Sequence, residues 1–288
     1  MDIEWEKLIV EEDWQTLDKT NHTNIAVVIR KILNFIDQND NSYEFQFKIL
    51  LFVQKYYIND LDIKSDILRL IKATNIHYSL KEFALKILLS KLGASIDIIT
   101  ELNFILKNHK QDDFLRARII DLITGFYWNI IDKDFILNYI TYSLQIRRAI
   151  VDYIGIFYKD FEELIVDIIE NEQDNRLISI LIKNLNENIS SKLQSLLITL
   201  LEQTTDIFVK IEIIHFLRSK SSENNIQQQL ISILLDNKEP YLVRAQSYQS
   251  LMDRSIDNII QGHLDKDETI NDSFLLQILQ IKGEASWK

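Results

Sequence analysis

Hydrophobic residues recur along this chain with the period of an α-helix. Between residues 25 and 36 they follow the i, i+3, i+4, i+7 spacing of one helical face. This stripe comprises Ile25, Val28, Ile29, Ile32, Leu33 and Ile36. Thr, Ser, Asp and Asn recur between stripes, where their side chains can cap helix starts. The pattern predicts sixteen helices, spanning roughly residues 22–37, 41–57, 61–73, 77–92, 95–107, 111–127, 132–141, 143–158, 160–170, 173–187, 189–203, 205–219, 223–236, 239–253, 255–264 and 270–281.

A basic residue marks the second helix of successive helix pairs. The seven anchor residues are Lys48, Lys81, Arg116, Arg147, Arg176, Lys210 and Arg244. They are 29 to 35 residues apart, and a period of this size is typical of a solenoid. We therefore predict an all-α fold, a right-handed α-solenoid of about eight helical hairpins over residues 22–281. No linker interrupts the pattern, so a single continuous domain, 1–288, is expected, with an acidic helical cap at residues 1–20.

Composition supports this fold class and removes several alternatives. The chain has five glycines and one proline, too few for the turns of a large β-protein, and it lacks glycine-rich phosphate loops. It has no cysteine, which excludes disulfides and thiolate metal sites. Neither a secretion signal nor a long uncharged apolar run is evident, so we expect a cytoplasmic protein with no membrane contact.

Residues 236–252, DNKEPYLVRAQSYQSLM, resemble the second-helix signature of HEAT repeats. The matching positions are Asp236, Val243, Arg244, Ala245 and Leu251. Segments 112–123 and 206–217 resemble it more loosely, and armadillo-like arrays are similar in period. The resemblance implies a scaffold or binding surface, with the basic anchors in polar ladders between repeats or, alternatively, in contact with a partner.

The net charge of −11 bears on the choice of partner. Such a surface repels phosphate backbones, which makes nucleic acid an improbable partner, and it favours a basic protein. Residues 1–20 hold seven acids against two lysines. This segment is interpreted as a polar cap over the first repeat or as a docking element for a basic protein.

Aromatic and acidic side chains supply the candidate binding residues. The aromatic candidates, near the ends of second helices, are Tyr56, Tyr57, Tyr127, Trp128 and Tyr158. Tyr127 and Tyr158 stand eleven residues after their anchors, so they form either a ridge for a partner or packing between repeats. Asp121, Asp152 and His215 share a repeat position, five residues after their anchors. We expect them to be polar groups that line the inner surface, with a metal or acid–base site as the alternative.

We interpret the chain as a protein-binding solenoid without catalytic activity, cofactor or metal. The most specific form of this prediction is an inhibitor such as an immunity protein, which would neutralise a basic bacterial toxin through complementary charge. The alternatives are a HEAT-like nucleic-acid-binding enzyme, similar to DNA glycosylases, or a small-ligand lyase or chaperone. A continuous Lys/Arg groove enclosing a carboxylate would favour the first alternative, and a deep aromatic pocket would favour the second.

Overall fold

A computed structural model describes residues 25–38, 42–56, 61–73, 75–92, 95–186, 188–251, 256–266 and 272–285. Within these ranges the regular elements are sixteen α-helices and three short 3-10 helices. The predicted all-α solenoid class is thereby confirmed. The predicted acidic cap at residues 1–20 lies outside the described residues. No helix in the described part has the length and hydrophobicity needed to cross a bilayer.

The chain divides into two compact units, residues 1–150 and 151–288. The boundary falls inside helix α10 (Leu144–Ile156). Each unit is described by itself below. The expectation of a single continuous domain and the right-handed sense of the solenoid stay predictions.

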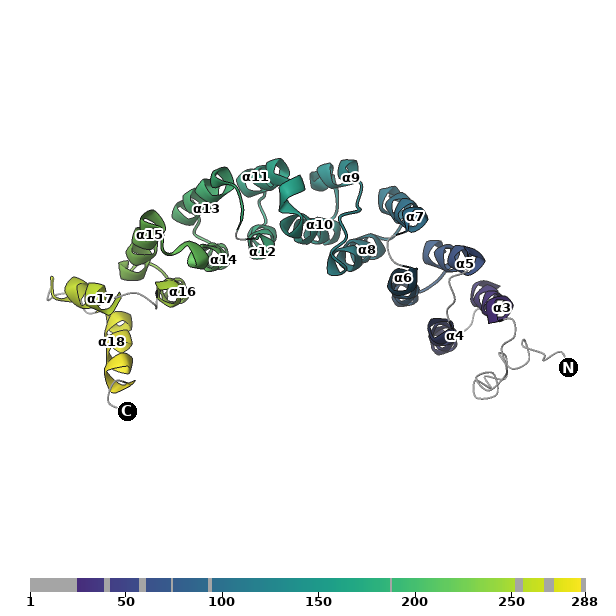
Figure 1. Cartoon of the computed structure of the whole chain (residues 1–288), viewed down its shortest axis with the longest axis horizontal. Helices are drawn as coiled ribbons and strands as arrows, with labels where there is room; N and C mark the ends of the chain where they lie inside the picture. Colours follow the sequence, from purple (N-terminus) through teal and green to yellow (C-terminus); the bar gives the residue numbers. More distant parts are fainter. Residues whose placement is uncertain are drawn as a thin grey trace. The chain divides into compact units, whose positions relative to one another are not determined.

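Unit 1 is a stack of helical hairpins in two rows. Its elements before α10 are α3 (Ile25–Gln38), α4 (Tyr43–Tyr56), α5 (Leu61–Lys72), α6 (Tyr78–Leu92), α7 (Ile96–Lys107), α8 (Asp113–Gly125), α9 (Lys133–Leu137) and η1 (Tyr139–Thr141). In Figure 1, α3, α5, α7 and α9 form the first-helix row, and α4, α6 and α8 form the second-helix row. Contacts join the two helices of each hairpin and also join α4 to α6 and α6 to α8. Each hairpin therefore buries its apolar face against its neighbours.

Unit 2 has the same organisation. Its elements after α10 are η2 (Tyr158–Asp160), α11 (Glu162–Asn171), α12 (Asn175–Asn184), α13 (Ser191–Gln203), α14 (Ile207–Leu217), η3 (Arg218–Lys220), α15 (Asn224–Leu235), α16 (Tyr241–Leu251), α17 (Ile256–Leu264) and α18 (Ser273–Ala285). Second helices α12, α14 and α16 contact one another in order, and α11 contacts α13 in the first-helix row. The helices thus correspond one to one with the sixteen predicted from sequence.

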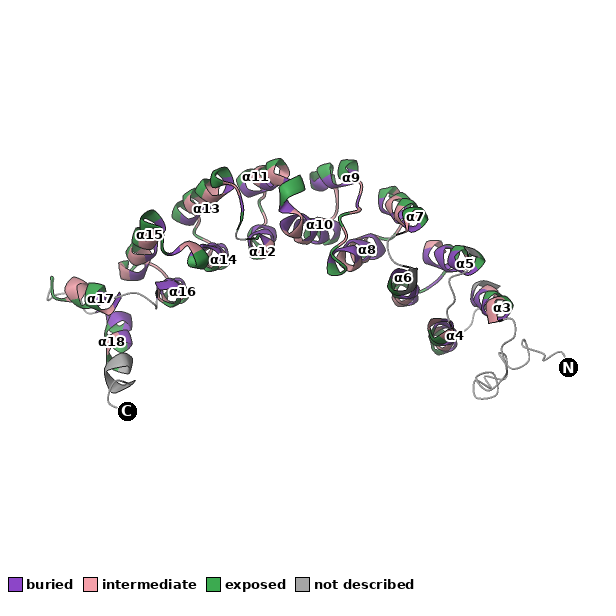
Figure 2. Cartoon of the chain, in the orientation of Figure 1, coloured by how far each residue is buried: buried purple, intermediate pink, exposed green. Residues whose placement is uncertain are grey.

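The core of each unit lies between its two rows, where buried positions of neighbouring helices face one another (Figure 2). In α3, the stripe predicted from periodicity is buried from Val28 to Ile36, while Ile25, in the first turn, is half-buried. One predicted helix, residues 132–141, is interrupted. Its Asn138 side chain donates to the Asp134 carbonyl at 2.7 Å, and the chain continues as a 3-10 turn. Asparagine competes with the helical backbone in this way.

Three of the basic anchors are structural, as the HEAT resemblance implied. Arg116 and Arg244 are buried, and each donates its Nε–H to a carbonyl ten residues earlier, at the end of the preceding first helix, at 2.8 Å. Arg244 also binds the buried Asp272 at 2.5 Å, and Lys210 pairs with Glu239. Arg176 differs, because its side chain is 78% exposed and pairs with Asp174 at the start of its own helix.

Most ion pairs between neighbouring hairpins, over the part of the chain that the structure describes, share one direction. In six of them, and in a longer contact of Arg30 with Asp66 at 3.5 Å, the basic residue belongs to the earlier hairpin and the acidic residue to the later one. The six pairs are Arg30–Asp62, Lys64–Asp97, Lys72–Glu101, Lys107–Asp132, Lys210–Glu239 and Arg244–Asp272. One pair, Arg118–Glu82 in the second-helix row, runs the other way. We call the set of six the charge ladder.

Candidate functional site

The two candidate aspartates are engaged within their own units. Asp121, in α8, accepts a hydrogen bond from Nη1 of Arg118 at 3.4 Å. Asp152, in α10, accepts one from Nδ2 of Asn184 in α12 at 2.7 Å. Asp121 belongs to unit 1 and Asp152 to unit 2. Asp152 thus helps to join α10 to α12, and a partner-binding role for either carboxylate stays a prediction.

Tyr127 and Tyr158, which share a repeat position, have opposite environments. Tyr158 is buried, with 6% of its surface exposed, and its hydroxyl donates to the Asn188 carbonyl at 2.9 Å. It therefore serves as packing between repeats, the second of the two roles considered for the aromatics, and offers little surface to a partner. Tyr127 is 74% exposed. The difference comes from the helix ends: Tyr158 begins a 3-10 turn, whereas Tyr127 follows the C-terminus of α8 in a left-handed conformation.

Of the three remaining aromatic candidates, Tyr56 is the last residue of α4 and Tyr57 follows it in the sequence, while Trp128 is described below. Tyr56 is half-buried, packs against Phe52 with ring centroids 4.7 Å apart, and carries the Lys55 ammonium 5.1 Å from its ring centroid. It is thus partly occupied by residues of its own helix. Tyr57 lies outside the described residues.

The C-terminus of α8 is closed by a Schellman motif. The Trp128 N–H donates to the Ile123 carbonyl at 3.2 Å, and the Tyr127 N–H donates to the Thr124 carbonyl at 2.9 Å. Tyr127 has φ 57°, the left-handed value that this motif requires and that glycine usually supplies. Helix α8 does contain a glycine, Gly125, but two positions too early. A bulky residue in this conformation costs about 1–2 kcal/mol.

The resulting feature, which we call the aromatic corner, consists of Phe126, Tyr127 and Trp128. The rings of Phe126 and Trp128 stack, with centroids 4.9 Å apart and an angle of 19° between their planes. Among the described residues the Tyr127 ring has no aromatic partner. A strained backbone here presents an exposed ring beside a stacked pair, and such outliers concentrate at functional sites.

Sequence reasoning missed a second group of exposed side chains. Large apolar residues lie exposed at the N-terminal ends of second helices, whereas the aromatic candidates predicted from sequence lie near the C-terminal ends of these helices. They are Tyr43, Tyr78, Phe114 and Leu144 in unit 1, and Phe208, Tyr241 and Leu242 in unit 2. Side chains in a first turn point back beyond the helix, where no preceding turn covers them. The sequence signal was available, since each lies two to five residues before an anchor.

Two of these residues belong to an aromatic cluster across α4 and α6. Tyr43 stacks on Phe47 and meets His77 edge-on, with centroids 6.3 and 5.5 Å apart. His77 contacts Tyr78 at 5.0 Å, and Phe47 contacts Phe83 at 5.1 Å. The rings cover one another partly, so the cluster both packs two repeats together and leaves ring surface exposed.

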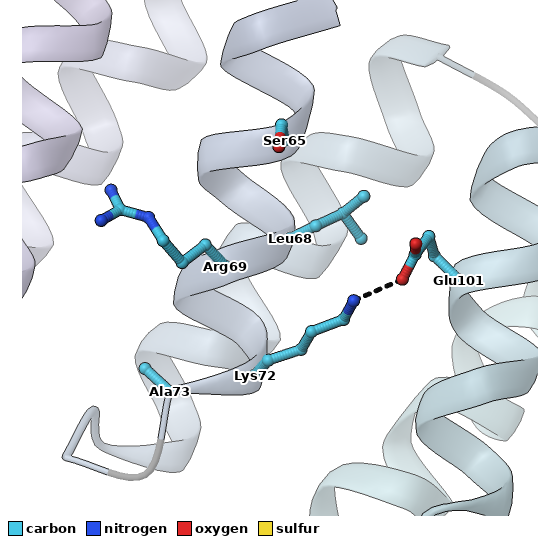
Figure 3. Close-up of a pocket in the computed structure, with 6 residues that line it drawn as sticks. All are labelled: Ser65, Leu68, Arg69, Lys72, Ala73 and Glu101. Atoms are coloured by element: carbon cyan, nitrogen blue, oxygen red, sulfur yellow. Dashed lines mark hydrogen bonds and ion pairs between the residues drawn. The ribbon is translucent and has the colours of Figure 1, made fainter.

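A recess of about 480 Å³ lies between α5 and α7 (Figure 3). Its cations are Arg69 and Lys72. Arg69 donates to Asn34 at 2.5 Å, and Lys72 pairs with Glu101 across the recess. Both cations are thus committed to neighbours in the first-helix row. This surface belongs to the charge ladder and lacks the deep aromatic character that a small-ligand pocket needs.

A smaller recess of about 280 Å³ in unit 2 adjoins η2 and the segment after α12. Its polar lining includes Lys159, Asp160, Asn186 and Asn188. Over the residues that the structure describes, no three His, Asp or Glu side chains are grouped so that they could hold a metal ion.

Comparison with known proteins finds a likeness at the level of structure only. No protein-family model matches the sequence, and no curated protein sequence matches it. Among solved structures, the chain is similar to human deoxyhypusine hydroxylase in complex with glycerol, at 11% identity and a TM-score of 0.33. The match covers 89% of this chain and 96% of that one.

This match corrects one prediction. We expected the chain to have no catalytic activity, but the matched protein is by its name a hydroxylase. The statement that the chain is not an enzyme is therefore withdrawn. The named activity is a property of that protein, and the proposal below concerns binding alone.

Proposed function

We propose that this chain binds a protein partner and that the aromatic corner contacts it. The observation that supports the proposal is Tyr127, an exposed aromatic ring at a left-handed backbone position where glycine would be more stable. Tyrosine and tryptophan give large, rigid contact area with few rotatable bonds, and they dominate the energy of many interfaces. A residue that costs stability but faces solvent is explained most simply by a contact outside the chain.

The net charge of the chain, −11, supports a basic partner. Most of the acidic excess lies in unit 2, with 22 Asp and Glu against 13 Lys and Arg, whereas unit 1, which holds the aromatic corner, has 21 against 19. Helix α11 exposes Glu163, Asp167 and Glu170 at i, i+4 and i+7, so one of its faces is acidic. Complementary charge accelerates encounter with a basic protein more than it raises affinity. The more specific prediction, an immunity-type inhibitor of a basic bacterial toxin, fits such a partner and rests on charge alone.

Co-purification from the native host tests this proposal. The parent chain is compared with Tyr127→Ala, which removes the exposed ring, and with Phe208→Ala as a matched control, because Phe208 is 71% exposed in unit 2. We expect a basic protein to be retained by the parent and by Phe208→Ala, and to be lost from Tyr127→Ala. Equal retention by all three chains would exclude the aromatic corner as the contact. An acidic partner would contradict the charge argument, and a toxin gene beside this one would support the immunity role.

A further inference from the structure

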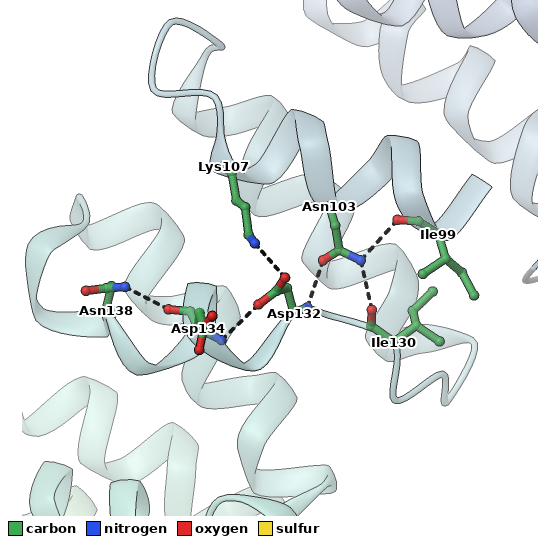
Figure 4. A network of polar contacts seen from close by, with 7 residues as sticks. All are labelled: Ile99, Asn103, Lys107, Ile130, Asp132, Asp134 and Asn138. Carbon is green, nitrogen blue, oxygen red and sulfur yellow. Dashed lines mark hydrogen bonds and ion pairs between the residues drawn. The ribbon is translucent and has the colours of Figure 1, made fainter. Parts of the chain in front are cut away.

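The aromatic corner is followed by a short return segment, residues 129–132, that leads into α9. One side chain of α7 is bonded to this segment (Figure 4). Asn103 accepts a hydrogen bond at Oδ1 from the Asp132 N–H at 2.7 Å. Its Nδ2 donates to the Ile130 carbonyl at 3.0 Å and to the Ile99 carbonyl of its own helix, also at 3.0 Å. The Asn103 side-chain amide thus donates to one backbone group of the return segment and accepts from another, as the backbone of an adjacent strand would.

Other contacts fix the end of the same segment. Asp132 accepts from Lys107 of α7 at 2.5 Å and caps the start of α9 by accepting from the Asp134 N–H at 2.9 Å. The Lys107 side chain is 49% exposed and that of Asp132 is 33% exposed, so this pair is partly screened by solvent and salt. Asn103 is half-buried and uncharged, so its hydrogen bonds depend less on salt than the Lys107–Asp132 pair does.

The corner is therefore held from both sides, by the Schellman motif on α8 and by Asn103 on the return segment. We propose that Asn103 is a positioning residue, which keeps the aromatic corner in its binding geometry without touching the partner. The proposal rests on the proposed function. A loop that is already ordered loses less conformational entropy when it binds. The apparent affinity is therefore proportional to the fraction of molecules that already hold the binding conformation.

Two measurements test the ordering without a partner. The first is amide hydrogen exchange of residues 126–132 in Asn103→Ala. Loss of two hydrogen bonds should speed exchange of the Asp132 amide about thirtyfold, because each bond is worth about 1 kcal/mol. The second is acrylamide quenching of Trp128 in a chain where Trp5, Trp14 and Trp287 are phenylalanine. Quenching should increase in Asn103→Ala.

Asn138→Ala is the matched control. Asn138 belongs to the same polar network, but its side chain donates to the Asp134 carbonyl of its own helix and not to the return segment. This variant should leave Asp132 exchange and Trp128 quenching at parent values. If Asn103→Ala also leaves both at parent values, Asn103 does not order the segment and the inference is wrong. If it instead lowers the melting temperature of the whole chain, with exchange raised throughout α7 and α8, the role is general packing and the inference is also wrong.

Binding separates this inference from the proposed function. The ligand for this measurement is the basic protein that the parent chain retains and that Tyr127→Ala loses. We expect Asn103→Ala to lower the affinity for this protein about two- to tenfold, and Asn138→Ala to leave that affinity unchanged. An affinity equal to the parent, despite faster Asp132 exchange, would overturn the positioning role while the proposed function stands. Failure of Tyr127→Ala to affect binding would overturn the proposed function, and with it the positioning role.

Discussion

Replacing Tyr127 with glycine should stabilise the protein and weaken its partner binding at the same time. Glycine adopts the left-handed φ of 57° without strain, which removes a cost of about 1–2 kcal/mol. Glycine also makes the unfolded chain more flexible, which takes back about 0.5–1 kcal/mol. Because the ring is 74% exposed, truncation removes little buried surface. The net expectation is a gain of up to about 1.5 kcal/mol, or up to about 3–6 °C in the unfolding midpoint for a unit of this size.

The assay is thermal unfolding followed by circular dichroism, with Tyr127→Ala as the comparison. Alanine removes the same ring but keeps a Cβ in the left-handed region, so it should show no comparable gain. The difference between the two variants isolates the backbone contribution from that of the ring. Both variants should lose the partner to the same extent, since both lack the aromatic contact. A midpoint that falls in Tyr127→Gly would refute the reasoning, because it would mean that the ring supports the fold.

The remaining predictions concern stability and salt. Gly155→Ala should destabilise unit 2 by about 1–3 kcal/mol in urea unfolding. The reason is that the new Cβ would lie 2.7 Å from Cβ of Asn184 and 3.2 Å from the Leu181 carbonyl oxygen. An unchanged unfolding midpoint would mean that α10 and α12 can move apart at no cost in stability. Asp272→Asn should cost about 3 kcal/mol at pH 7, because it leaves the buried Arg244 charge unpaired. Burial alone raises the pKa of Asp272, but hydrogen bonds from Arg244 and two backbone N–H groups outweigh it and hold that pKa below its ordinary value. This stabilisation is present above the unfolded pKa of about 3.9 and is lost as pH falls through the folded pKa. The free energies of unfolding of the parent and of Asp272→Asn should therefore converge in acid. A difference that stays constant with pH would contradict the assignment. The association rate with a basic partner should fall several-fold between about 50 and 200 mM salt; a salt-independent rate in stopped-flow measurements would remove the charge argument.

Periodicity was sufficient to predict the helices and their buried faces. The stripe from Val28 to Ile36 is buried as predicted, because helical spacing alone decides which side chains share a face. The role of Arg244 was also accessible, since its signature carries the HEAT resemblance. Its acidic partner was not, because Asp272 lies 28 residues away in a segment without a recognisable motif.

The site was less accessible, because exposure at a helix end depends on how that end is closed. Tyr127 and Tyr158 occupy one repeat position, yet one is exposed and the other buried. Nothing in the local sequence signals a tyrosine at the left-handed position of a Schellman motif when Gly125 stands nearby. Asn103 was equally hidden, since its hydrogen bonds to Ile130 and Asp132 span more than 25 residues.

The charge ladder has a consequence for how such an array can lengthen or shorten during evolution. In each of its six pairs, the earlier hairpin presents a basic group to the hairpin that follows, and the later hairpin presents an acidic group to the one that precedes it. The α5–α6 and α7–α8 hairpins carry both groups, so duplicating or deleting one of them in the gene would bring opposite charges together at the new junction. Ladder pairs of mixed direction would place like charges in contact after such an event. The shared direction of the six pairs therefore lets these hairpins be gained or lost as whole repeats without a repulsive junction.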